Sequence, residues 1–166
     1  MPTVHTVPTD FADLATALAH ADVSDTDTIQ LHYTHVENGG SAITVSKEVT
    51  IKTLGTAGQA TISEQLIIDA SNVTLTNLKL NHDGADGSMI KPSANTHENL
   101  TINYCTIDCK SSSDHSATNT TDKIMVVKDT TLSGVFTFDN NTVLQSRCGA
   151  ALEVGTGAGG IVTEAY

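Results

Sequence analysis

The chain has 166 residues, a length that suits a single domain. Hydrophobic residues make up 39% of it, but aromatic residues only 4% and Trp is absent, so the core must be built from Val, Ile, Leu and Ala. The formal charge is -11, from 19 acidic and 8 basic residues, and the sequence contains no cluster of Lys and Arg, which excludes nucleic acid as a partner.

The first predicted element is an amphipathic helix over residues 10–21. Apolar side chains recur there at i, i+3, i+4 and i+7, which places them on one face. They are Phe11, Leu14, Ala15 and Leu18. Thr9 or Asp10 is expected to cap the N-terminus of this helix, with Asp13 near the positive end of its dipole.

Beyond the helix the apolar period changes to two, the period of a half-buried strand. The predicted strands are residues 28–32, 42–45, 49–51, 60–62 and 66–68. Gly, Asn, Asp or Ser interrupts them every few residues. No second amphipathic helix follows, which counts against a βαβ architecture.

An apolar-Thr-apolar repeat occurs four times, with Thr at positions 50, 74, 101 and 137, spaced by 24, 27 and 36 residues. Six positions after the last three threonines stand Leu80, Ile107 and Val143, and three positions after two of them stand Asn77 and Asn140. The first two intervals suit one coil of a β-helix. The third suits a coil with an insertion, for which the polar segment 110–122 is the candidate.

These patterns predict an all-β fold, a short parallel β-helix over residues 1–154 with an N-terminal capping helix. One coil cannot bury its apolar positions alone, whereas stacked coils place like residues above like and form aliphatic ladders. Asn at a repeated corner tolerates left-handed backbone and can bond its neighbour one coil away. An antiparallel β-sandwich or jelly roll is the alternative that many short strands also permit.

Two segments resemble a known group, the right-handed parallel β-helix proteins of the pectin-lyase-like superfamily. Their opening helix and first strand are similar to Phe11-x-x-Leu14-x-x-Ala17-Leu18, a polar gap, then residues 27–31. Residues 72–80 (Asn-Val-Thr-Leu-Thr-Asn-Leu-Lys-Leu) resemble a typical coil. The resemblance covers residues 9–154 and implies a right-handed coil. A further resemblance is to β-helix modules of phage tailspikes and capsid-decorating proteins, which are often trimers.

Enzymes of the superfamily imply a set of catalytic residues that this sequence lacks. Its lyases use calcium, several acids and a basic proton acceptor, and its hydrolases use grouped aspartates with Gly-His-Gly and Arg-x-Lys motifs. Arg147 is the only arginine here, and neither motif is present. We therefore predict no catalytic residue.

Metal candidates are few. Residues 82–87 contain Asp83 and Asp86, a candidate for weak calcium binding or a small acid/base cluster, with a plain glycine-punctuated loop as the alternative. Cys105 lies in an apolar strand pattern and is expected to be buried. Cys109 follows at a spacing that suits half of a metal site, but no second pair completes it. We predict no resident cofactor apart from this possible calcium ion.

The seven histidines show no metal-binding spacing. His32 and His35 flank Tyr33 near the end of a predicted strand. We expect both to occupy solvated loop positions, with an interface or pH-sensitive patch as the alternative.

The C-terminal segment, residues 155–166, is predicted to be a glycine-rich arm. Its candidate interface residues are Gly155, Gly157, Gly159, Gly160, Ile161, Val162 and Tyr166. The short apolar stretch after the glycines suits docking onto a neighbouring subunit or partner by strand addition.

No charged and apolar leader opens the sequence and no stretch is long enough to cross a membrane, so we expect a product made in the cytoplasm that reaches the virion or the outside by lysis. The expected function is that of a non-enzymatic virion protein, a trimeric capsid decoration or cement protein that contacts capsid or other virion proteins. The alternatives are a carbohydrate-active enzyme (polysaccharide lyase or glycoside hydrolase) or its remnant, and a module that binds surface glycans.

Overall fold

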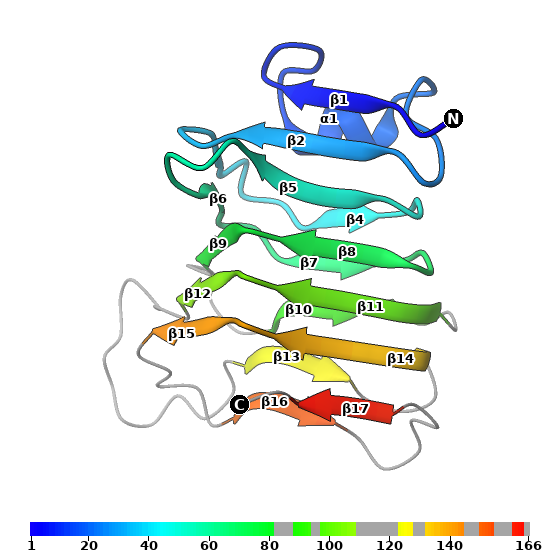
Figure 1. Ribbon diagram of the computed structural model, residues 1–166, viewed down its shortest axis with the longest axis vertical. Coiled ribbons are helices and arrows are strands. Elements are labelled where there is room, and N and C mark those ends of the chain that lie inside the picture. The colour runs from blue at the N-terminus through cyan, green and yellow to red at the C-terminus, as the bar shows by residue number, and fades with distance from the viewer. Residues whose placement is uncertain are drawn as a thin grey trace.

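The computed structural model describes residues 1–81, 88–93, 97–108, 123–127, 132–144, 150–154 and 161–164. Its strands form three sheets of seven, five and five strands, here called sheets A, C and B. In Figure 1 the chain crosses sheet A in front, turns back through sheet B, returns behind through sheet C and descends with each circuit. This path is a right-handed coil, as the family resemblance implied.

The elements have the following bounds. Sheet A consists of β1 (Val4–Val7), β2 (Thr28–His32), β5 (Thr50–Leu54), β8 (Val73–Thr76), β11 (His97–Asn103), β14 (Leu132–Asp139) and β17 (Ile161–Glu164). Sheet B consists of β3 (Val36–Glu37), β6 (Ala60–Ile62), β9 (Leu78–Asn81), β12 (Thr106–Asp108) and β15 (Thr142–Leu144). Sheet C consists of β4 (Ile43–Val45), β7 (Leu66–Ile68), β10 (Ser88–Pro92), β13 (Lys123–Val127) and β16 (Ala150–Val154). The helix is α1 (Leu14–Ala19).

The repeat found in the sequence is the register of sheet A. Thr50 pairs with Thr74, Thr74 with Thr101, and Thr101 with Thr137. In sheet B, Ile107 lies between Leu80 and Val143, again as the repeat requires. Every pairing among the described strands is parallel, so the antiparallel sandwich is wrong.

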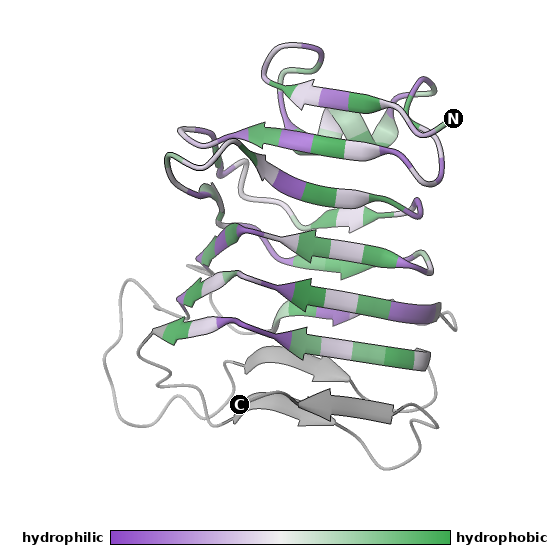
Figure 2. Cartoon of the chain, viewed as in Figure 1, coloured by the Kyte–Doolittle hydropathy of each residue, from purple (hydrophilic) through white to green (hydrophobic). Residues whose placement is uncertain are grey.

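The core is a set of aliphatic ladders. Figure 2 shows hydrophobic and polar bands alternating along the strands of sheet A, because successive side chains point to opposite faces. Ile29, Ile51, Leu75 and Ile102 stack in register and are fully buried. Burying one such side chain contributes about 1.5–3 kcal/mol relative to leaving it exposed.

The corners of the coils use left-handed backbone. Asn72, Asn77, Asn99 and Asn140 have φ between 52° and 55°. Asn tolerates this region better than most residues, because its short polar side chain bonds nearby groups. The amide of Asn99 donates from Nδ2 to Oδ1 of Asn72, one coil away, at 2.9 Å. The prediction of asparagine corners is confirmed.

The N-terminal end differs from expectation in detail. Asp13, not Thr9 or Asp10, caps α1, and its Oδ1 accepts from Thr16 N at 2.6 Å. Asp10 instead accepts from Thr6 N at 2.7 Å, which closes a turn after β1 and delays the helix.

The stripe of α1 is also corrected. Leu14, Ala17 and Leu18 are buried, whereas Ala15 is exposed. The helix lies at the N-terminal end of the coil behind β1, and it covers the core there (Figure 1).

Candidate functional site

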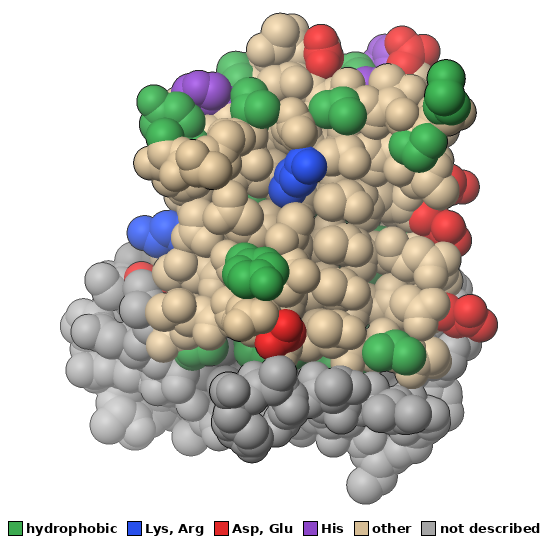
Figure 3. Space-filling model, in the orientation of Figure 1, with side chains coloured by type: hydrophobic (Ala, Val, Ile, Leu, Met, Phe, Trp, Pro, Cys, Tyr) green, Lys and Arg blue, Asp and Glu red, His purple; other side chains and the backbone are tan. Residues whose placement is uncertain are grey.

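The outward side of sheet A is a flat surface of mostly small polar side chains, here called the threonine face. One column of it holds Val4, Thr28, Thr50, Thr74, Thr101 and Thr137, and the other holds Thr6, Gln30, Lys52, Thr76, Asn103 and Asp139. Neighbours in a column are about 4.8 Å apart, the spacing of paired strands. Figure 3 looks onto this face and shows few charged groups across its middle.

The threonine face carries almost no net charge. Lys52 and Asp139 are the only charged side chains among its twelve positions, although the whole chain carries -11. Depletion of charged residues marks the centre of protein interfaces. Threonine is also stiff at χ1, so such a surface loses little side-chain entropy on contact. The face therefore has the character of a contact surface.

Tyr104 stands at the edge of this face, on the corner between β11 and β12. It occupies the position that Asn77 and Asn140 hold in the neighbouring coils, and it shares their left-handed backbone with φ 53°. The residue is 58% exposed. Gln59 Nε2 donates to Tyr104 O at 2.9 Å, which helps to hold the corner. A bulky residue in this conformation is unusual and carries strain.

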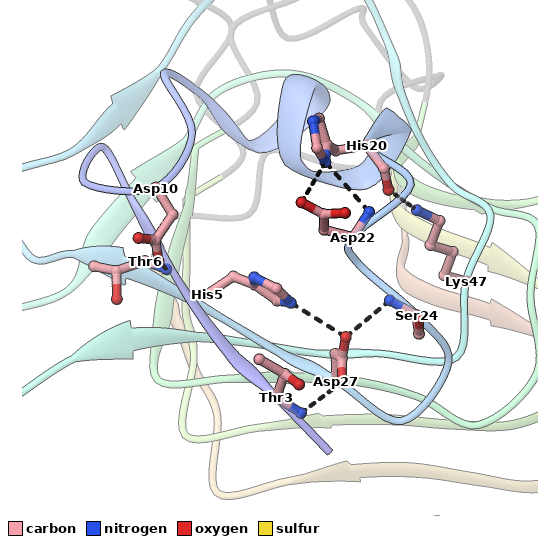
Figure 4. Close-up of polar contacts among 9 residues, drawn as sticks. All are labelled: Thr3, His5, Thr6, Asp10, His20, Asp22, Ser24, Asp27 and Lys47. Atoms are coloured by element: carbon pink, nitrogen blue, oxygen red, sulfur yellow. Dashed lines mark hydrogen bonds and ion pairs between the residues drawn. The ribbon is translucent and has the colours of Figure 1, made fainter. Parts of the chain in front are cut away.

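A second structured site lies at the N-terminal end, around the buried carboxylate of Asp27 (Figure 4). Its oxygens accept from Thr3 N at 2.6 Å and Ser24 N at 2.8 Å, and His5 Nε2 lies 3.2 Å away. Hydrogen bonds from Ser24 and Thr3, with a smaller contribution from His5, lower the pKa of Asp27. This carboxylate ties the first residues of the chain to β2.

A matching pair joins α1 to sheet B. His35 Nε2 lies 2.8 Å from Glu37 Oε2, and the same oxygen accepts from Leu14 N at 3.0 Å. Glu37 is buried, and the side chain of His35 is mostly covered. The expectation of a solvated His35 is therefore wrong, because the chain path brings it to a carboxylate two residues away on the inner side of β3. His32 is half-buried and bonds Thr34 Oγ1 through Nδ1 at 2.7 Å.

Cys105 is buried and free, as predicted. Burial raises the pKa of its thiol to about 11. The sulfur donates weakly to Asn103 O at 3.3 Å. A thiol with this pKa stays protonated near neutral pH and is a poor nucleophile and metal ligand.

Most of the predicted site residues lie outside the described part of the chain: Asp83, Asp86, Gly155, Gly157, Gly159, Gly160 and Tyr166. Cys109 and Arg147, which were weighed above, also lie outside it. Ile161 and Val162 are described, as the first residues of β17, where they pair with Val135 and Phe136 of the same chain. Their contact with another subunit stays a prediction, now from the end strand of sheet A.

Among the described residues, three buried oxygens lack a hydrogen-bond partner there: Glu64 Oε2, Asn103 Oδ1 and Asp108 Oδ1. No group of three or more His, Cys, Asp or Glu side chains gathers closely enough to hold a metal within the described residues. No helix in the described part of the chain is both long and apolar enough to cross a membrane.

The chain matches no protein-family model, no curated protein and no solved structure.

Proposed function

We propose that this chain is a non-enzymatic structural protein that acts through subunit and surface contacts, specifically a capsid decoration or cement protein of a phage-like particle. The observation that carries the proposal is the threonine face: a flat, nearly neutral surface on a chain of charge -11. A surface of this kind suits contact with another protein better than it suits a charged small ligand.

The coil supports the same role. Parallel ladders that run the length of the described chain make a rigid body, which is what a particle surface needs from a clamp or spacer. The right-handed path, the three sheets and the helix at the N-terminal end also support the finer likeness to pectin-lyase-like proteins and to the β-helix modules of phage tailspikes. That step is an analogy from fold to function.

The proposal includes two further parts. Residues 155–166 are assigned to docking on capsid or other virion proteins, through the end of the coil that β17 forms. On the particle, the protein is assigned a trimeric ring, and the particle is assigned to release by lysis. Cross-linking of intact, purified particles tests the trimer.

Particle purification tests the proposed role most directly. Particles banded on a density gradient from a lysate of the source cells are expected to contain this chain in a fixed ratio to the major coat protein. Quantitative mass spectrometry gives that ratio. A chain found only in the soluble fraction contradicts the particle role.

A sugar-release assay tests the enzymatic alternative. A panel of acidic and neutral polysaccharides is expected to yield no reducing ends or unsaturated products with the purified chain, with and without calcium. Turnover that is lost in Asp83→Ala and Asp86→Ala would replace the structural role by the carbohydrate-active one.

A further inference from the structure

We propose that the threonine face binds the same face of a second copy of this chain, around a two-fold axis that lies in the contact plane, parallel to the strands and between β8 and β11. This inference rests on the proposed function, since it names the partner of the surface that carries it. A two-fold contact uses the same patch on both copies, so the patch must be complementary to itself.

The two charges of the face meet this requirement. Lys52 on β5 and Asp139 on β14 stand in the same outward column, with Thr76 and Asn103 between them. Rotation about the proposed axis keeps each column opposite itself and reverses the order of the strands. It therefore sets Lys52 of one copy opposite Asp139 of the other, twice per dimer. Lys52 has no ion partner among the described residues of its own chain.

The uncharged positions pair equally well. The rotation sets Thr50 opposite Thr137, Thr74 opposite Thr101, and Thr76 opposite Asn103. All are small, and the threonine hydroxyls can donate and accept hydrogen bonds across the contact, although Asn103 Oδ1 is buried within its own chain. A two-fold axis parallel to the coil axis would instead set each strand opposite itself and exchange the two columns. It would place Lys52 opposite Thr50. Only the first arrangement brings the opposite charges together.

Tyr104 gives an independent reason to place the axis here. Its strand β11 is adjacent to the axis, so the tyrosines of the two copies lie side by side at one edge of the contact. Tyrosine is enriched among the residues that dominate interface energies. The neighbouring coils keep Asn at this corner, which costs less strain in left-handed backbone. An interface anchor explains why an exposed aromatic occupies the corner.

The area of the proposed contact sets the strength of association that we expect. The rotation sets six strands over one another, namely β2, β5, β8, β11, β14 and β17. With about five residues each, they cover on the order of 500 Å² per copy, or about 1,000 Å² in the dimer, from ordinary strand dimensions. That total is at the low end for specific interfaces. We therefore expect a dimer that dissociates on dilution and weakens with added salt.

Light scattering over a concentration series tests the contact, with circular dichroism to confirm folding of each variant. Lys52→Asp and Asp139→Lys each place like charges opposite each other and should weaken association by at least about tenfold. The double variant Lys52→Asp/Asp139→Lys should restore it. Lys79→Asp makes the same charge change on sheet B and should leave association unchanged.

Tyr104→Asn separates the contact from the stability of the fold. It installs the residue of the neighbouring corners, so thermal stability should hold or rise while association is lost.

Two outcomes overturn the inference: a mass that is the same for wild type and Lys52→Asp at every concentration, or a double variant that fails to restore association. If the chain still co-purifies with particles in that case, the proposed function stands without this contact. If the charge swap behaves as expected but particles lack the chain, only the particle role fails.

Discussion

Asn99 Oδ1 lies 2.6 Å from the position that a Cβ on Gly134 would take, and the same oxygen accepts a hydrogen bond from Val135 N at 2.9 Å. The register of β11 and β14 shifts at this point, so Gly134 and Val135 together oppose Asn99. The bulge lets the asparagine reach the backbone of the next coil. Gly134, with φ 77°, has both the backbone freedom and the missing side chain that this contact needs.

Gly134→Ala should therefore destabilise the fold by more than its backbone strain alone. Gly55→Ala is the matched control, because Gly55 has a similar φ of 81° and open space around it. We expect about 1 kcal/mol of destabilisation for Gly55→Ala, and at least about 1 kcal/mol more for Gly134→Ala through the lost hydrogen bonds of Asn99. Urea unfolding measures both. Equal losses in the two variants would show that Asn99 moves away without cost.

Asp27→Asn should reduce stability near neutral pH and make no difference in strong acid. The folded pKa of Asp27 is lowered, so the unfolded chain binds the proton more tightly than the folded chain. The stabilisation is complete above the unfolded pKa of about 3.9 and is lost as pH falls through the lower folded value. Asp22→Asn is the control, because the side chain of Asp22 is 79% exposed. Unfolding curves at about pH 6, 4 and 2.5, which lie above, near and below that unfolded pKa, give the comparison. A loss in Asp27→Asn that is independent of pH contradicts the account.

Asp13→Ala should lower the free energy of unfolding by about 1 kcal/mol, because it removes the cap of α1. Asp10→Ala should instead loosen the turn after β1 and leave the helix cap in place. Asp13 accepts from Thr16 N at the first turn of α1, whereas Asp10 accepts from Thr6 N. Thermal unfolding gives the cost. Amide exchange at Thr16 should rise only in Asp13→Ala, and exchange at Thr6 only in Asp10→Ala. The opposite pattern would assign the cap to Asp10, as the sequence alone suggested.

Cys105 should resist alkylation in the folded chain at pH 8 and react after unfolding in urea. Its thiol is buried and its pKa is raised to about 11, so the thiolate is scarce at pH 8. Mass spectrometry of the peptide that contains Cys105 resolves this site from the other two cysteines. Labelling at the same rate in water and in urea would show that the site is open.

The sequence predicted the coil because the repeat is short-range and regular. Thr50, Thr74, Thr101 and Thr137 mark one position of each coil, and stacking like residues fixes their register. The helix cap was misplaced because two aspartates, Asp10 and Asp13, each satisfy the capping pattern locally. Only the turn after β1 decides between them.

The contact between His5 and Asp27 was missed because the two residues meet only through the fold. His5 and Asp27 are separated by 22 residues and meet only when β1 pairs with β2. The near neutrality of the threonine face became apparent only once the strand register showed which residues share that face. The corner position of Tyr104 could have been predicted, because it stands three residues after Thr101, where the repeat has Asn77 and Asn140. It was overlooked because tyrosine rarely adopts left-handed backbone.

Zero-length cross-linking of a concentrated sample tests most directly that the threonine face is a contact surface. A carbodiimide joins a lysine to a carboxylate only when the two touch. Within one chain Lys52 and Asp139 lie three strands apart, about 14 Å at ordinary strand spacing. The account predicts a Lys52–Asp139 cross-linked peptide in the dimer band and none in the monomer band. A dimer band whose cross-links all join other lysines and acids would contradict it.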